Sequence, residues 1–495
     1  MSGDLLAPTQ LIELREFNKQ LPIATLPPEL LSEIFLECID RGSVSILDPR
    51  SSVAAVRRVR TTLASVCHRW RQVARATKTL WAVTSFPNRI TKILSDGETS
   101  SYIIPPAAYE SFQYELELLG GASISLISQI TCDDLELSSL MPTLEHDLRN
   151  MLSPVLSRCG QVLLEAPREV SVSLLTAFPE KLSNIKSLDI RAWGEYSDHG
   201  NADLKTLDLS HANTIQKLSI NFFGRYPSWG LLPTANPRLG SADNLKNLTI
   251  LGYVNPSAAY GIVSRARSLH SLTWPSIDGL PDFIFPPGQI SMQFLRYIAL
   301  GEIGPVSLFS HLDAPNTRSV VLKDSLQRVN PTPFPFPSRF IHLRSLILES
   351  TMYTLSPLLP PLVLEFRALE VLIMRGVMSM ELASACTGAT NLRLVAATWV
   401  STTPSKWLGS QRLLDHWSDR IHIQDIAPLS CGFCFVYHVD PSEAERRTFI
   451  QSFPTKYPDI KIGLRSSHPL ASWQPEDWDG FFTRVDTNPS YLPTF

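Results

Sequence analysis

From about residue 115 onward, short apolar segments alternate with joints rich in proline, serine and glycine. Ten segments follow one pattern, two of them weakly: an apolar residue, two others, a second apolar residue, one other and a third apolar residue. The middle apolar positions are Leu188, Leu207, Leu218, Leu248, Leu272, Ile298, Val320, Leu346, Leu372 and Val395. From Leu248 onward they recur at intervals of 24, 26, 22, 26, 26 and 23 residues, which indicates a structural repeat.

Each segment is predicted to be a β-strand whose second and third apolar residues face the core, because alternate side chains of a strand share a side. One repeat cannot bury this face alone, so neighbouring repeats are expected to stack into a solenoid. The intervals match leucine-rich repeats, which run about 20–29 residues and form a horseshoe. Earlier strands are expected at Ile124–Ile130 and Val162–Leu164.

Two features depart from the leucine-rich repeat pattern. The asparagine that usually follows the strand is missing at the matching positions. Leu207 and Leu218 are only 11 residues apart, so one of them is not expected to belong to an independent turn of the solenoid. The alternative is a globular α/β domain in which the leucine spacing is coincidental.

Residues 21–81 have a helical pattern, interrupted by turn residues at about 41–52. Pro27 and Pro28 suit a helix start, where the missing N–H costs nothing. Two pairs of apolar residues four positions apart share helix faces, Leu30 with Ile34 and Leu31 with Phe35. A second helix is expected to carry one apolar stripe made of Leu63, Val66, Cys67, Trp70, Val73 and Ala74.

Three motifs occur in order in this region: Leu26–Phe35, Leu63–Ala74 and Leu80-Trp81. Together they resemble the F-box of fungal proteins, which joins an L-P-x-E-[IL]-L-x-x-I-F helix, a V-C-x-x-W-x-x-[VL]-A helix and a closing L-W. The resemblance implies a unit that binds a small Skp-type adaptor and, through it, a cullin. It implies adaptor contacts from Leu26, Pro27, Leu30, Leu31, Ile34, Phe35, Val66, Cys67, Trp70, Val73 and Trp81. The stretch 40–59 is longer than in compact F-boxes, and helices that merely cap the solenoid are the alternative.

The expected fold class is α/β, with a small N-terminal three-helix F-box followed by a leucine-rich-repeat-like solenoid. The expected boundaries are a lead-in at 1–20, an F-box-like domain at 21–85, a linker at 86–114 and the solenoid at 115–495, with a C-terminal cap from about 410. An aromatic cluster is expected to close the open end of the solenoid, because terminal repeats need capping. It consists of Trp473, Trp478, Phe481 and Phe482.

Composition narrows the class of protein and its location. The net charge of −3 argues against a dedicated nucleic-acid binder, and the basic cluster of Arg57, Arg58 and Arg60 is expected to lie in a solvated loop or helix start. No basic start with an apolar run follows Met1, and no apolar run approaches the ~18 residues of a membrane helix. The 7 cysteines form no disulfide framework, so the cytosol or nucleus is expected.

Two groups of residues have spacings found in metal or catalytic sites. Cys431 and Cys434, with His422 and His438 near in sequence, have zinc spacing, but their apolar context favours buried free thiols. His416, His422 and Asp425 are not accompanied by a nucleophile elbow or a phosphate loop. No metal, no cofactor and no enzymatic activity are therefore expected.

The outward positions of the strands change character along the chain. In the early strands they are polar, as at Asp189 and Arg191, whereas Val321, Ile347, Val371 and Ile373 are apolar. A contiguous exposed apolar patch usually marks a partner site, so these four residues are the expected substrate-binding surface. The alternative is that a C-terminal segment covers and buries them.

The function expected from the resemblance is that of a substrate-recruiting adaptor subunit of an SCF-type (cullin–RING) ubiquitin ligase. The F-box would bind the Skp-type adaptor, and the repeats would bind an unknown protein substrate. Neither nucleic acid nor membrane is expected as a partner. The alternative is a protein-interaction scaffold, unconnected with ubiquitin, whose F-box-like helices only cap the solenoid.

Overall fold

The structure is a computed structural model, and it divides the chain into two compact units, Met1–Trp193 and Gly194–Phe495. This division does not fall at the boundaries expected at residues 85 and 114. The described residues are 26–40, 49–86, 91–94, 100–103, 106–129, 150, 152–167, 170–171, 175, 179–194, 206–224, 236–252, 254–274, 286–301, 308, 311–323, 340–349, 366–375, 394–399, 432–437 and 461–465.

The first unit begins with a group of packed helices. They are α3 (Pro28–Asp40), α4 (Pro49–Val66), α5 (His68–Ala76) and the 3-10 helix η1 (Lys78–Trp81). Leu31 and Phe35 of α3 are fully buried, whereas Leu30 and Ile34 on the same helix are exposed. The two pairs expected from the sequence therefore lie on different, adjacent faces of α3, one toward the helices and one toward solvent.

Two local expectations for these helices are wrong. The turn-rich stretch was expected to continue to residue 52, but α4 already begins at Pro49, since proline is well suited to a first helical position. The second apolar stripe is also divided between two helices. Cys67 has extended backbone angles and its Sγ accepts a hydrogen bond from the Trp70 N–H (3.4 Å), so it ends α4 and caps α5.

The remainder of the first unit is built on a parallel sheet. Its strands are β1 (Val83–Phe86), β4 (Ile124–Gln129), β5 (Cys159–Pro167) and β6 (Ser187–Gly194), each parallel to the next. The early strands expected from the sequence correspond to β4 and β5. The expected linker, 86–114, instead holds an antiparallel hairpin and most of a helix: β2 (Thr91–Leu94), β3 (Ser100–Ile103) and α6 (Pro106–Leu119). A short 3-10 helix, η2, spans Pro179–Asn184.

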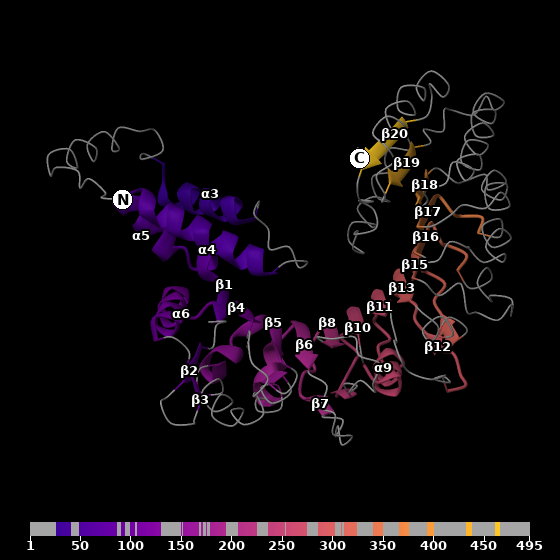
Figure 1. Ribbon diagram of the computed structural model, residues 1–495, viewed down its shortest axis with the longest axis horizontal. Helices are drawn as coiled ribbons and strands as arrows, with labels where there is room; N and C mark the ends of the chain where they lie inside the picture. Colours follow the sequence, from indigo (N-terminus) through magenta and orange to yellow (C-terminus); the bar gives the residue numbers. More distant parts are fainter. Residues whose placement is uncertain are drawn as a thin grey trace. The chain divides into compact units, whose positions relative to one another are not determined.

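The second unit is a parallel-sheet solenoid, in which each strand of the main sheet lies beside the next one along the chain (Figure 1). These strands are β8 (Lys217–Gly224), β10 (Asn247–Gly252), β11 (Ser271–Trp274), β13 (Tyr297–Gly301), β15 (Ser319–Lys323), β16 (Ser345–Glu349), β17 (Val371–Arg375), β18 (Leu394–Trp399), β19 (Gly432–Tyr437) and β20 (Lys461–Arg465). The expected fold class, F-box-like helices followed by a solenoid, is confirmed. Within the described residues no helix is long and apolar enough to cross a membrane.

The repeat pattern of the sequence corresponds to the register of this sheet. Leu218 pairs with Leu248, Leu248 with Leu272, and Leu272 with Ile298, so the middle apolar positions form one buried row. The row continues through Val320. The predicted orientation of these side chains toward the core is therefore confirmed.

The close spacing of Leu207 and Leu218 has a simple structural cause. Leu207 lies in β7 (Thr206–Leu209), which pairs with β9 (Asn236–Leu239) in a separate two-stranded sheet. Leu218 lies in the main sheet. The 11-residue spacing predicts that one of the two leucines does not belong to an independent turn of the solenoid. That residue is Leu207, which lies outside the main sheet. A second small sheet joins β12 (Ile290–Ser291) to β14 (Leu312–Asp313), and α9 (Pro256–Val263) packs against β9.

Beyond residue 410, where a cap was expected, β19 and β20 extend the main sheet. The aromatic cluster that includes Trp473 and Trp478 lies outside the described residues. The cap therefore stays a prediction for that cluster.

Two cysteines of the first unit are expected to differ strongly in reactivity. Cys159 is fully buried at the start of β5, and burial raises the pKa of its thiol to about 12. Cys38 is an exposed free thiol on α3. Because the thiolate is the nucleophile, we expect Cys38 to be alkylated at least about tenfold faster than Cys159 in the folded protein. Peptide mass spectrometry after a timed reaction with iodoacetamide checks this. Equal rates in the folded protein would contradict it, whereas unfolding in urea should make the two rates similar.

Candidate functional site

Exposed apolar side chains gather on the N-terminal helices. Leu30 and Ile34 of α3 are 46% and 38% exposed, and Val66 at the end of α4 is 50% exposed. Leu30 and Ile34 are four residues apart, so they share one face of α3. Pro27, just before the helix, is also exposed. Large apolar side chains with this exposure are available to a protein partner.

A second set of residues packs behind this surface. Leu31, Phe35, Val73 and Trp81 are buried, so they support the helices and do not themselves offer a surface. Trp70 is half-buried, and its ring lies against Phe35 with centroids 5.0 Å apart at 54°. The residues expected to contact the adaptor thus fall into an exposed set, a buried set and three half-buried positions, Leu26, Cys67 and Trp70.

Polar contacts hold the helices together at their ends. An Arg69 Nη2 hydrogen donates to the Leu26 carbonyl, which ties α5 to the segment before α3. The hydroxyls of Ser32 and Thr77 are 2.8 Å apart, and the Trp81 indole N–H donates to the Ala74 carbonyl (2.8 Å). These bonds fix the start of α3 relative to α5, where the exposed residue Leu30 lies.

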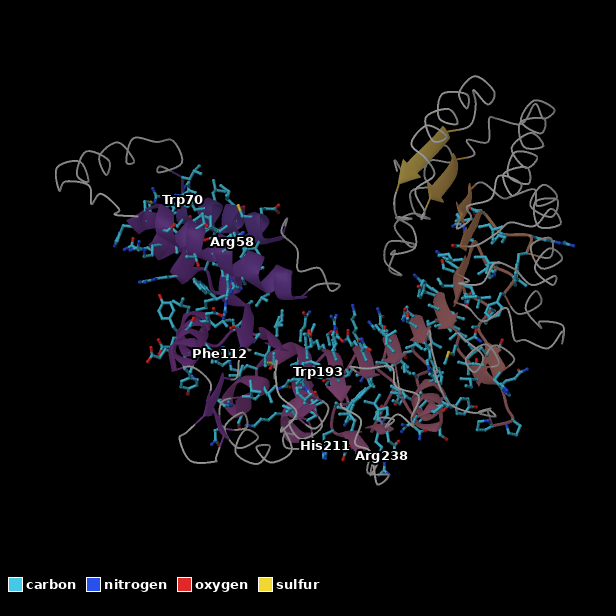
Figure 2. All side chains as sticks on the ribbon, in the orientation of Figure 1. Arg58, Trp70, Phe112, Trp193, His211 and Arg238 are labelled. Atoms are coloured by element: carbon cyan, nitrogen blue, oxygen red, sulfur yellow. The ribbon has the colours of Figure 1, made fainter. Side chains whose placement is uncertain are left out.

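The sequence predicts that the basic cluster of α4 is solvated. This prediction is wrong, because one of the three arginines is buried. Arg58 is exposed (Figure 2), but Arg60 is only 2% exposed and donates through Nη2 to the Val83 carbonyl of β1. Its guanidinium also lies over the Trp81 ring, 5.5 Å from the centroid. Desolvation lowers the pKa of Arg60 to about 10, which nearby Glu115 partly offsets, so the side chain stays charged at neutral pH.

Glu115 of α6 is the carboxylate of this buried network. Its Oε1 accepts from the Arg57 Nε–H (3.0 Å), and its Oε2 accepts from the Thr84 hydroxyl (2.6 Å). The network therefore joins α4, α6 and β1 within the first unit. The prediction from the sequence missed this buried role of the basic cluster. The spacing of Val56, Arg60 and Leu63, which is the i, i+4, i+7 spacing of one buried face, could have indicated it.

The expected apolar patch of the later strands is not exposed. Val321, Ile347 and Val371 are all buried, and the side chain of Ile373 is outside the described part of the chain. The expectation that these side chains face solvent is wrong for the first three, because strand alternation alone does not show whether other parts of the chain cover a sheet face. Substrate binding by the four residues stays an untested prediction.

The spacings considered for metal and catalytic sites fall largely outside the described residues. Cys431, His416, His422 and Asp425 are among the residues not described, and Cys434 lies in β19. Where the structure describes the chain, no group of three or more His, Cys, Asp or Glu side chains could hold a metal ion.

Comparison with known proteins gives a family match over the N-terminal helices. Residues 23–85 match the family described as F-box-like. Residues 23–85 form an F-box-like domain. F-box domains generally bind Skp-type adaptors, and the proteins that carry them are typically non-enzymatic. No curated protein matches the chain. The F-box-like domain thus contains α3, α4, α5 and η1, and it carries Leu30, Ile34 and Val66 on its surface.

Proposed function

We propose that this protein is the substrate-recruiting subunit of an SCF-type (cullin–RING) ubiquitin ligase. The observation that carries the proposal is the exposure of Leu30, Ile34 and Val66 on helices that match the F-box-like family. A unit this small buries little apolar surface by itself, and a partner commonly covers what remains. The exposed set would contact the Skp-type adaptor, and the buried set would hold the helices in position.

The proposed mechanism requires no chemistry from the chain itself. The F-box-like domain would bind the adaptor and thereby the cullin, and the solenoid would bind a protein substrate. Tethering raises the effective concentration of the substrate near the ubiquitin-loaded enzyme, so that transfer becomes nearly intramolecular. A non-enzymatic role follows, with no cofactor, and with the cytosol or nucleus as its location. We further propose that the solenoid coils are irregular leucine-rich repeats, as their 22–26-residue intervals suggest.

A scaffold with no link to ubiquitin is the second candidate. The buried network around Arg60 and Glu115 favours the scaffold. This network joins the F-box-like helices to α6 and β1, which is the kind of attachment that a structural cap needs. Helices that served only as a cap would have no need for three large exposed apolar residues on their outer surface. The two candidates therefore differ in whether Leu30, Ile34 and Val66 acquire a partner.

Affinity purification of the tagged full chain from cells, followed by mass spectrometry, tests the proposal. We expect a Skp-type adaptor and a cullin to be enriched well above an untagged control, because adaptor and cullin form one assembly with an F-box. Recovery of neither, under conditions in which a known F-box protein recovers both, would favour the scaffold.

A further inference from the structure

In the second unit, the residue before each strand belongs to a continuous backbone ladder. The Gln216 carbonyl accepts hydrogen bonds from the N–H groups of both Lys246 and Asn247. The same double acceptance recurs at each following coil as far as the Arg344 carbonyl, which accepts from Glu370 and Val371, with N···O distances of 2.7–3.1 Å throughout. Equivalent residues of neighbouring coils are therefore held in register, about 4.8 Å apart.

Five consecutive positions of this ladder are basic residues or histidine, and we name them the basic column: Lys246, His270, Arg296, Arg318 and Arg344. The whole chain has only 44 lysines and arginines and 11 histidines among 495 residues, and its net charge is −3, so this run departs from the composition. Lys246 and Arg296 are exposed and the other three are partly exposed.

The end of the ladder shows how such a column binds a carboxylate. Arg344 donates from Nε and Nη2 to the two carboxylate oxygens of Glu370, at 2.7 Å and 3.0 Å. Glu370 occupies the next position of the same ladder, so an acidic side chain here lies directly in line with the column. Two parallel N–H···O bonds are the favoured geometry of an arginine–carboxylate pair.

Exposed apolar residues flank the column. Phe294 is 57% exposed, and its ring stacks on His270 with centroids 5.9 Å apart at 22°. Ile341, in the turn three residues before Arg344, is similarly exposed. A surface that combines lysine and arginine side chains with a rigid aromatic ring can bind both the charged and the apolar side chains of a peptide.

We propose that the basic column binds an extended acidic peptide segment of another protein, with an apolar side chain of that segment packed on Phe294. Arg344 is already paired with Glu370, so the remaining column runs from Lys246 to Arg318, is about 14 Å long and matches about four residues of an extended chain. Its charges are spread along a line, which suits a series of single carboxylates. A phosphate group would instead require several donors that converge on one point.

A nucleic acid fits these observations less well than a peptide does. One short row of cations on a chain with net charge −3 offers little of the broad basic face that phosphate neutralisation requires. The inference adds to the proposed function the chemistry of the recruited protein. It rests on the proposed function only for what happens after binding, which is the transfer of ubiquitin to that protein. Peptide binding itself involves the solenoid and needs no adaptor.

The test is a binding measurement on the purified full chain without adaptor. The probe is a labelled peptide of about 12 residues that alternates glutamate with serine and contains one leucine, long enough to extend past both ends of the column. Fluorescence anisotropy is expected to show binding that weakens as salt is added. The double variant Lys246→Glu/Arg318→Glu should weaken binding at least about tenfold, because it replaces two attractions with repulsions.

Arg238→Glu is the matched control, since Arg238 is an exposed arginine on β9, in the separate small sheet and outside the column (Figure 2). It should bind the peptide as the unaltered chain does. The double variant should melt at an unchanged temperature, whereas Arg238→Glu places a carboxylate opposite Asp208 of β7 and should melt slightly lower. Equal affinity of the two variants would overturn the proposal, as would an absence of binding by the unaltered chain. Tighter binding of a glutamate-free peptide with one phosphoserine, or of single-stranded RNA, would also overturn it. None of these outcomes would affect recovery of the adaptor and cullin, so the two proposals fail separately.

Discussion

Replacing Leu30 and Ile34 with aspartate is expected to weaken binding of a Skp-type adaptor at least about hundredfold, because truncating one interface anchor commonly costs over 2 kcal/mol. Both side chains are exposed on one face of α3, so a charge at either position is solvated in the free protein. The loss of affinity arises because the bound adaptor would bury that charge with no opposite charge or hydrogen-bond donor beside it. Isothermal titration of the purified full chain with the adaptor measures the change.

The control for this variant is Tyr109→Asp, which places the same charge at an exposed aromatic residue of α6, outside residues 23–85. We expect Tyr109→Asp to leave adaptor affinity unchanged, and both variants to keep the melting temperature of the unaltered chain. Phe35 is not a suitable target, because it is fully buried against Trp70 and its loss would disturb the helices themselves. Undiminished affinity in the double variant would contradict the F-box assignment of the surface.

The substitution Glu115→Ala is expected to reduce the local stability of the first unit by about 3 kcal/mol, the upper end of what leaving a buried donor without its acceptor costs. Arg60 would remain buried without the carboxylate that raises its pKa, and the Thr84 hydroxyl would lose its acceptor. Hydrogen exchange of the α4 and α6 amides, read by mass spectrometry, should accelerate about hundredfold under conditions where exchange reports the opening equilibrium.

Glu117→Ala is the matched control, because Glu117 is exposed two residues further along α6. It removes the same charge from the same helix, so its effect on exchange should be small. If Glu115→Ala and Glu117→Ala behaved alike, the network would contribute nothing beyond surface charge. Amides of the solenoid coils in the second unit should exchange as in the unaltered chain in both variants.

The sequence predicts well those features that depend on local spacing. The apolar triplets predict both the strands and their register, since the spacing in each coil places equivalent leucines at the same height, as with Leu248 and Leu272. The i, i+4 pairs of α3 likewise predict a two-sided helix, although not which pair faces inward. The 11-residue spacing of Leu207 and Leu218 was itself informative, because it reflects the separate β7–β9 sheet.

Features that depend on contacts between distant residues could not be predicted in the same way. Arg60 is charged, so sequence alone places it in solvent, and its burial depends on the Val83 carbonyl, the Trp81 ring and Glu115, which is 55 residues further along the chain. Val321 and Ile347 alternate correctly, but their exposure depends on what covers the sheet. The basic column was visible in principle, since each member directly follows the first position of a triplet, as Arg296 follows Leu295.

The ladder of shared carbonyls also bears on how such a chain changes in evolution. Each coil attaches to the previous one through the same pair of N–H groups, whatever side chains the coil carries. A duplicated or deleted coil would therefore meet an acceptor of the correct geometry, provided that the break falls at equivalent positions such as Asn247 and Ser271. Duplication of whole coils could lengthen the solenoid and deletion could shorten it without a new fold. Either change would also alter the number of positions in the basic column. The length of the solenoid can therefore change in evolution while the length of the F-box-like domain stays the same.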